Sequence, residues 1–219
     1  MSSPVMVVVG AGPGLGAAVA RRYAREGYDV VLLSRDAEEL ERIGRELGSS
    51  GVEARWVALD VTDDAALRRA VTEAGERSGR VDVLHFNPSA FRHKDPLALS
   101  PDELLEDVRL GVGALLVAVQ AALPFMTTGG RVTATGSMAA DQPWNEAASL
   151  GVQKAGLRNL VRSIDTTLRP RGIRAVSVTV NGALAPDTAF APDKVADALF
   201  AAAHQDPGNW ADEIPFDGA

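Results

Sequence analysis

The chain has 219 residues, a formal net charge of −7, no cysteine and hydrophobic residues at 46% of its positions. The absence of cysteine excludes disulfide bonds, thiolate metal ligands and a cysteine nucleophile, and it fits a reducing compartment. Three histidines, His85, His93 and His204, are too scattered for a zinc motif, so no metal site is expected. The acidic balance argues against nucleic acid as the main partner.

Short valine-rich runs alternate with longer helical patterns along the chain, which is typical of stacked β-α-β units. Strands buried on both faces appear as continuous apolar runs rather than alternating ones. We therefore expect one α/β domain over residues 1–219, built on a doubly wound parallel sheet in three layers, α/β/α. The predicted strands are Val5–Val9, Asp29–Leu33, Glu53–Ala58, Val81–Phe86, Arg131–Thr135, Arg174–Val180 and Glu213–Phe216.

Capping residues mark where the helices begin. Ser100-Pro101-Asp102-Glu103 is a capping box with proline at the first helical position. Asp36 and Asp63 are predicted N-caps of two further helices. Long helices are expected over Pro101–Met126 and from near Glu146 to Arg169, and a final helix over Asp193–His204.

The sequence gives no sign of a targeting or membrane segment. Met1-Ser2-Ser3-Pro4 lacks the basic region that precedes the apolar stretch of a signal peptide. The uncharged stretch Leu110–Met126 is shorter than the ~20 apolar residues that span a bilayer, and it is interrupted by glycines and a proline. We expect it to be a buried or interface helix in a cytoplasmic protein that has no membrane partner.

A glycine-rich turn, Gly10-Ala11-Gly12-Pro13-Gly14-Leu15-Gly16, follows the first predicted strand and opens a helix. Glycines in this position let the backbone approach a pyrophosphate, and the helix N-terminus supplies N–H donors and partial positive charge. A tight turn without a ligand is the simpler alternative. Because no lysine follows the glycines, the turn is not a nucleoside-triphosphate P-loop.

The spacing of Gly10, Gly14 and Gly16 resembles that of the short-chain dehydrogenase/reductase family, whose fold is of the Rossmann type. Ser137 at the end of the fifth predicted strand resembles the family's catalytic serine, and Lys154 follows it at the family's spacing. The resemblance implies a catalytic Ser137 and Lys154, with Lys154 also holding the ribose of a nicotinamide cofactor. The cofactor-binding residues that it implies are Gly10, Pro13, Gly14, Leu15, Gly16, Ser34, Arg35, Asp60, Val61, Asn87, Lys154 and Gly182.

The end of the second predicted strand indicates which nicotinamide cofactor is bound. An acidic residue here would bond the ribose hydroxyl of NAD, but this chain has Ser34-Arg35 instead. A hydroxyl followed by a permanently charged guanidinium suits a 2′-phosphate, so NADP(H) is preferred over NAD(H). An ordinary surface arginine at position 35 is the alternative.

The chain departs from the family where proton transfer takes place. The family's tyrosine lies four residues before its lysine, and that position is Leu150, which cannot transfer a proton. The tetrad asparagine corresponds to Gly111, within one or two residues. The chain's two tyrosines, Tyr23 and Tyr28, belong to the cofactor half and cannot replace the missing one.

Four other side chains are candidates for the lost acid: His85, His93, Asp141 and Glu146. His85 is expected to be a buried neutral histidine rather than a catalyst, and His93 lies in a polar loop from which it could reach a substrate. The two carboxylates flank Trp144 and are interpreted as solvated groups at the rim. The segment after the sixth strand, residues 183–192, is short, which predicts a small or open substrate pocket.

Three functions remain open at this point. The first is an NADP(H)-dependent oxidoreductase with an altered proton donor, acting on a carbonyl, imine or enone. The second is a catalytically silent NADP(H)-binding sensor or partner subunit, and the third is non-redox chemistry in the same pocket. By resemblance, the two long helices pair across a two-fold axis, so a homodimer or homotetramer is expected.

Overall fold

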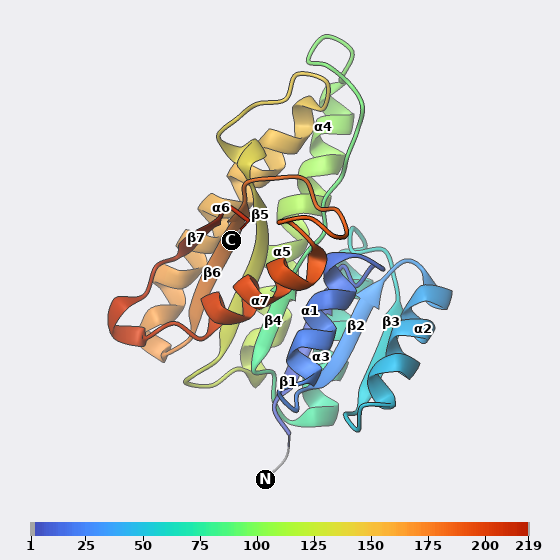
Figure 1. Ribbon diagram of the computed structural model, residues 1–219, viewed down its shortest axis with the longest axis vertical. Coiled ribbons are helices and arrows are strands. Elements are labelled where there is room, and N and C mark those ends of the chain that lie inside the picture. The colour runs from blue at the N-terminus through green and yellow to red at the C-terminus, as the bar shows by residue number, and fades with distance from the viewer. Residues whose placement is uncertain (1–2, 219) are drawn as a thin grey trace.

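Parallel strands form one sheet in the order β3-β2-β1-β4-β5-β6-β7 in the computed structural model, which describes residues 3–218 (Figure 1). The order reverses direction between β1 and β4, which is where doubly wound folds place their ligands. The predicted fold class is confirmed. The strands are β1 (Val5–Val9), β2 (Asp29–Ser34), β3 (Ala54–Ala58), β4 (Val83–Phe86), β5 (Arg131–Ser137), β6 (Arg174–Val180) and β7 (Glu213–Phe216).

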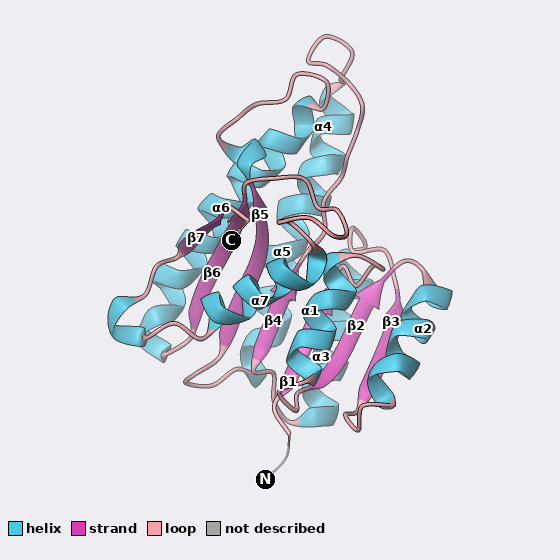
Figure 2. Cartoon of the chain, viewed as in Figure 1, coloured by secondary structure: helices cyan, strands magenta, loops and turns pink. Residues whose placement is uncertain are grey.

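Helices cover both faces of this sheet and complete the three layers (Figure 2). On β1, Met6 and Val8 pack into one hydrophobic cluster while Val7 and Val9 pack into the other. Both faces of the strand are therefore buried, which explains its uninterrupted apolar run. One face carries α1 (Leu15–Ala24), α2 (Ala37–Gly48) and α7 (Pro192–Ala203), and the other carries α3 (Asp64–Ser78), α5 (Ala114–Ala122) and α6 (Ala148–Leu168).

The N-caps follow the sequence prediction closely. Asp36 accepts a hydrogen bond from the Glu39 amide at the start of α2, and Asp63 accepts one from Ala66 at the start of α3. Ser100 and Glu103 form the full capping box of α4 (Pro101–Val108). In each case the side-chain oxygen satisfies an amide that the helix itself cannot pair.

The two outer strands depart from the expected burial. Trp56 and Val57 of β3 are 37% and 38% exposed, and β7 is only partly buried. Both strands lie at an edge of the sheet, where a second neighbouring strand and part of the helical cover are missing.

Several predicted boundaries were wrong by one or two residues. β4 begins at Val83 rather than Val81, because the Val81 amide donates to the Phe125 carbonyl instead of a neighbouring strand. β5 continues to Ser137, because Ser137 still pairs with Val180 of β6. β2 extends to Ser34, β3 begins at Ala54, α6 begins at Ala148 and ends at Leu168, and α7 spans Pro192–Ala203.

The predicted helix over residues 101–126 is divided into segments. A π-helical turn, Arg109–Gly113, separates α4 from α5, and a 3-10 turn over Leu123–Phe125 ends the run. Pro101–Phe125 is long and apolar enough to cross a membrane by length and composition alone, a test that core helices also pass. The buried residues of α5 join the core that this helix shares with α3.

Candidate functional site

The glycine turn lies at the point where the strand order reverses. Gly10 has a φ of +88°, a left-handed conformation that L side chains rarely adopt, and its carbonyl accepts a hydrogen bond from Asn87 Nδ2 at 3.0 Å. A Cβ on Gly16 would collide with the Gly10 carbonyl and stand 2.8 Å from the Ala11 Cα, so α1 approaches the turn closely only with glycine there. The end of β4 and the start of α1 are thus fixed around one loop.

A cavity of about 280 Å³ opens on this turn. It brings together five of the predicted cofactor-binding residues, which come from four different strand ends. The α1 N-terminus beside it has no side-chain cap, and no atom lies within 4 Å of a Cβ built on Gly12 or Gly14. This open, partly positive cradle suits an anionic phosphate group. The lining consists of Gly10, Gly12, Ser34, Arg35, Val61, Asn87, Pro88, Ser89 and Leu110.

Other predicted cofactor residues border this cavity without lining it. Pro13, Gly14, Leu15 and Gly16 form the rest of the turn and the first residues of α1. Asp60 precedes the lining residue Val61, and its Oδ1 accepts hydrogen bonds from the amide and the hydroxyl of Thr62. These bonds stabilise the carboxylate and lower the pKa of Asp60.

A second cavity, of about 480 Å³, opens at the ends of β5 and β6. It contains Ser137 and Leu150, so the predicted serine and the residue at the tyrosine position share one pocket. Ser137 Oγ accepts a hydrogen bond from the Ala139 amide at 3.2 Å, which leaves its own proton available to an acceptor in the pocket. The lining, which contains no charged residue, is Ser137, Met138, Ala139, Gln142, Pro143, Trp144, Leu150, Gly182 and Ala183.

Lys154 lies one helical turn beyond Leu150 on α6, where it is buried and lines neither cavity. Its Nζ donates to the Thr135 carbonyl at 2.9 Å, and burial lowers its pKa to about 8. The Thr135 hydroxyl in turn donates to Asn87 Oδ1 at 2.9 Å. Thr135 therefore links a residue of the first cavity to the lysine near the second, a role that sequence reasoning missed.

None of the four candidate replacement acids lines the second cavity. His85 is fully buried beside Thr133, as expected, and desolvation together with the Lys154 charge lowers its pKa to about 3. Asp141 is ion-paired with Arg158 at 2.6 Å, and Glu146 is exposed. His93 is exposed outside the pocket against Phe91.

The two tyrosines lie away from both cavities. Tyr23 is buried and packs edge-on against Tyr28 and Phe200, with ring centroids 5.1 and 5.0 Å apart. Desolvation raises the pKa of both tyrosines. Neither hydroxyl is placed to act on a group in the second cavity.

Gln153, which sequence reasoning also missed, fills the space beside Gly111. Its amide exchanges two hydrogen bonds with the backbone of Ala90, at 3.0 and 3.2 Å, although the side chain is completely buried. A Cβ on Gly111 would lie 2.7 Å from Gln153 Oε1. The lack of a side chain at Gly111, on the π-helical turn, thus leaves room for the large polar side chain of Gln153 on α6.

This packing predicts a strong coupling between the two positions. Gly111→Ala should lower the free energy of unfolding by about 1–3 kcal/mol, because the new methyl group overpacks against Gln153. In a Gln153→Ala background the same change should cost less, since the contact with Oε1 is gone and only the 3.0 Å approach to the Cβ of residue 153 remains, while alanine also favours a helix. Urea denaturation of the four proteins measures the coupling, and equal costs in both backgrounds would contradict it.

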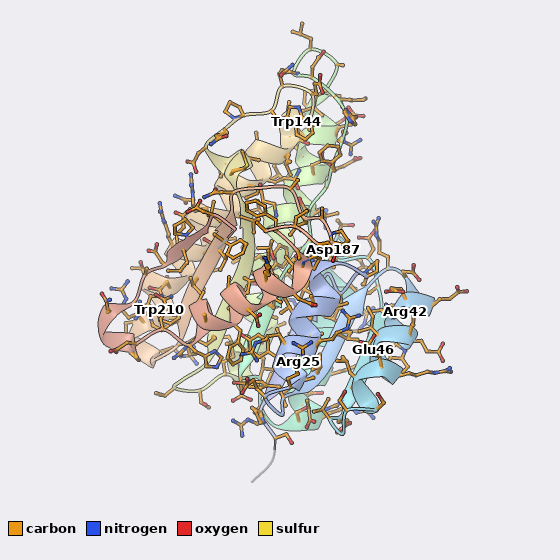
Figure 3. All side chains as sticks on the ribbon, viewed as in Figure 1. Arg25, Arg42, Glu46, Trp144, Asp187 and Trp210 are labelled. Carbon is orange, nitrogen blue, oxygen red and sulfur yellow. The ribbon has the colours of Figure 1, made fainter. Side chains whose placement is uncertain are left out.

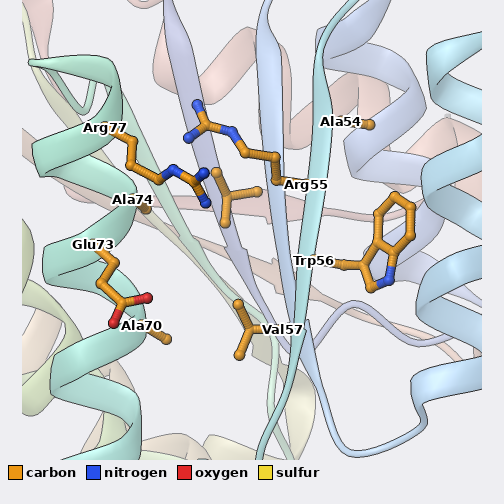
Figure 4. Close-up of a pocket in the computed structure, with 9 residues that line it drawn as sticks. Ala54, Arg55, Trp56, Val57, Ala70, Glu73, Ala74 and Arg77 are labelled. Atoms are coloured by element: carbon orange, nitrogen blue, oxygen red, sulfur yellow. The ribbon is translucent and has the colours of Figure 1, made fainter.

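A third cavity, of about 290 Å³, lies at the β3 edge and shares no residue with the other two. Figure 4 shows Arg55 and Val57 on the side of β3 that faces α3, while Trp56 lies on the opposite side. Arg55 is held by Glu53 and by the Ser78 hydroxyl. The cavity contains none of the predicted site residues, so we place the functional site at the strand ends.

Comparison with known proteins agrees with this geometry. The family model for short chain dehydrogenase matches residues 4–193. The oxidoreductase UcpA of Salmonella typhimurium is 30% identical over 184 residues, covering 81% of this chain and 68% of the relative. A 7alpha-hydroxysteroid dehydrogenase of Bacteroides fragilis is 27% identical over 187 residues, covering 83% of this chain and 72% of the relative.

Solved structures show the same architecture. A metagenomic short-chain oxidoreductase in complex with NADP superposes with a TM-score of 0.88 at 29% identity, covering 98% of this chain and 97% of that one. A short chain dehydrogenase from Burkholderia cenocepacia in complex with NADP gives a TM-score of 0.88 at 27% identity, covering 100% and 98%. The chain belongs to the short-chain dehydrogenase/reductase family of oxidoreductases.

Proposed function

We propose that the protein is an NADP(H)-dependent reductase of a small carbonyl, imine or enone compound, with Leu150 in place of the usual proton donor. The observation that carries the proposal is the pair of neighbouring cavities, one with Ser34 and Arg35 beside the glycine turn and one with Ser137. The bound cofactor would supply hydride. Arg35 and Ser34 would hold its 2′-phosphate, and Lys154 would hold the nicotinamide ribose.

The residues of the second cavity would orient the substrate rather than protonate it. The Ser137 hydroxyl would donate to the substrate oxygen or nitrogen, and solvent would deliver any proton, since none of the lining residues titrates near neutral pH. Complexes of relatives with NADP support the choice of cofactor. We also propose that the protein is cytoplasmic.

Leu150 also supports a second candidate, a catalytically silent NADP(H)-binding protein. A leucine facing Ser137 removes the family's acid, and a sensor or partner subunit would need only the first cavity. Turnover separates the candidates: NADPH binding in calorimetry without oxidation of NADPH by any carbonyl, imine or enone would favour the silent protein. Conversion of such a compound without NADPH and without a change of its oxidation state would favour the third candidate, non-redox chemistry in the same pocket.

Three helices, α4, α5 and α6, carry exposed apolar side chains, as expected of an oligomer. Leu105, Leu116 and Val152 are 65%, 43% and 49% exposed on α4, α5 and α6. We propose that these helices pair in a homodimer or homotetramer. Sedimentation of the intact protein gives the number of subunits.

The cofactor preference makes a direct prediction for Arg35. Arg35→Ala should weaken NADPH binding by roughly tenfold or more, because a charge-assisted bond to the 2′-phosphate is lost. NADH, which lacks that phosphate, should bind with unchanged affinity. Calorimetric titration with NADH is therefore the control for the titration with NADPH. Equal losses for both cofactors, or none, would contradict the assignment of Arg35.

A further inference from the structure

The second cavity has a chemical character that narrows the substrate of the proposed reductase. Its lining is apolar apart from Ser137 and Gln142, and it includes neither a carboxylate nor a cationic side chain. A charged substrate would lose its hydration there without gaining a partner of opposite charge. The cavity therefore favours an uncharged molecule, which argues against an iminium cation as well as against a carboxylate.

An aromatic cluster stands at the mouth of this cavity. The Trp144 ring lies 5.3 Å from that of Phe91, whose ring is 5.3 Å from that of His93. Trp144 lines the cavity and is 45% exposed, and Phe91 is 54% exposed. Figure 3 shows Trp144 near the end of the molecule that carries α4. Large exposed aromatic surfaces of this kind are recognition surfaces for flat rings, which they bind by stacking and by burial of apolar area.

The segments that carry these rings are held in place by buried polar contacts. The Ala148 amide donates to the Lys94 carbonyl at 3.1 Å, which joins the loop of Phe91 to the loop of Trp144. Arg92 makes two hydrogen bonds to the buried carboxylate of Asp107, and Ser149 donates to the same group at 2.6 Å. The mouth is thus preorganised, which lowers the entropic cost of binding.

The strength of the acid that each reduction requires indicates which group of the substrate reacts. Reduction at a carbonyl carbon makes an alkoxide, which needs an acid beside the oxygen, whereas Leu150 occupies that place and no lining residue replaces it. Reduction at the β-carbon of a conjugated carbonyl makes an enolate instead. The enolate is a much weaker base than an alkoxide, so a hydrogen bond from the Ser137 hydroxyl and protonation by solvent suffice.

From the cavity and its mouth, we infer that the substrate is an uncharged, aryl-substituted α,β-unsaturated carbonyl compound reduced at its carbon–carbon double bond; this rests on the proposed reductase function. The β-carbon gains a hydride from NADPH, and the π electrons move onto the carbonyl oxygen. Water then delivers a proton to the α-carbon. The products are the saturated carbonyl compound, NADP⁺ and the hydroxide that the water leaves.

A matched pair of compounds tests the inference with the full-length protein. Benzylideneacetone carries the conjugated double bond, and benzylacetone has the same skeleton without it. With NADPH deuterated at the transferred position, we expect the label on the β-carbon and turnover of the conjugated compound about 100-fold or more above that of the saturated ketone. Label on the carbinol carbon, or equal rates, would overturn the inference while leaving the proposed reductase intact.

Trp144 provides the test of the aryl group. Trp144→Ala should raise the KM for benzylideneacetone about tenfold with little change in kcat, whereas Trp144→Phe should retain most of the affinity. Calorimetric binding of benzylacetone should weaken in parallel, which gives a readout that does not depend on turnover. Unchanged binding in Trp144→Ala would overturn the stacking role. Absence of turnover with both compounds, while NADPH binds, would overturn this inference, whereas only failure of a full panel of carbonyl, imine and enone compounds would contradict the proposed reductase.

Discussion

Leu150→Tyr should increase reduction of simple ketones by about 10²–10⁴-fold, the usual contribution of a positioned general acid. Leu150 lines the same cavity as Ser137, and Lys154 follows it one turn later on α6. A phenol at this position would meet a substrate oxygen held by the serine hydroxyl. The neighbouring lysine, when charged, would favour ionisation of the phenol and so make it a stronger acid.

Leu150→Phe is the matched control for this experiment, since it adds the same ring without the hydroxyl. Steady-state ketone reduction with NADPH should rise only in the tyrosine variant. If the two variants behave alike, the phenol is not positioned for catalysis, and the geometry inherited around Ser137 has been lost. A gain with Leu150→Phe would show that pocket shape, rather than proton transfer, limits the wild-type protein.

The sequence predicted those parts of the protein that depend on local patterns. Continuous valine runs such as Val5–Val9 identified strands buried on both faces, and Asp36 and Asp63 were identified as caps from their positions alone. The glycine turn was located in the same way. Parallel strands end at one edge of the sheet, so residues after β2 and β4 were expected to meet there, and Arg35 and Asn87 do line one cavity.

What could not be predicted depends on contacts between distant segments. Gln153 is an ordinary polar residue until Gly111 lies opposite it and Ala90 offers both a donor and an acceptor. The segment of Trp144 was expected at the rim of the pocket, but its packing against Phe91 depends on the pairing of their two loops. Such roles are set by tertiary packing, which a single sequence does not display.

Replacement of Lys154 should change NADPH binding and protein stability in opposite directions. Lys154→Met should weaken NADPH binding by about 10–100-fold, because hydrogen bonds from a charged donor to the ribose would be lost. The same change should raise the free energy of unfolding by about 1–2 kcal/mol at pH 7. The buried ammonium group is costly to desolvate, and its single bond to the Thr135 carbonyl offsets only part of that cost.

The pH dependence of this difference follows from the lowered pKa of Lys154. The ordinary value, 10.5, applies to the unfolded chain, and burial brings the folded value to about 8. Below pH 8 both states carry the charge and the folded protein bears the full cost. Between pH 8 and 10.5 only the unfolded chain stays protonated, so wild-type stability relative to Lys154→Met rises with pH.

Urea denaturation of both proteins between pH 7 and 10 measures this change. The advantage of Lys154→Met should be largest at pH 7 and shrink above pH 8. Lys194→Met, at an exposed position on α7, removes the same charge from the surface and should alter neither stability nor NADPH affinity. A difference that does not vary with pH would mean that Lys154 keeps its ordinary pKa. If the difference does vary with pH as expected, the charged Lys154 destabilises the protein in the absence of cofactor. Such a residue is retained because it binds the cofactor, and not because the fold requires it.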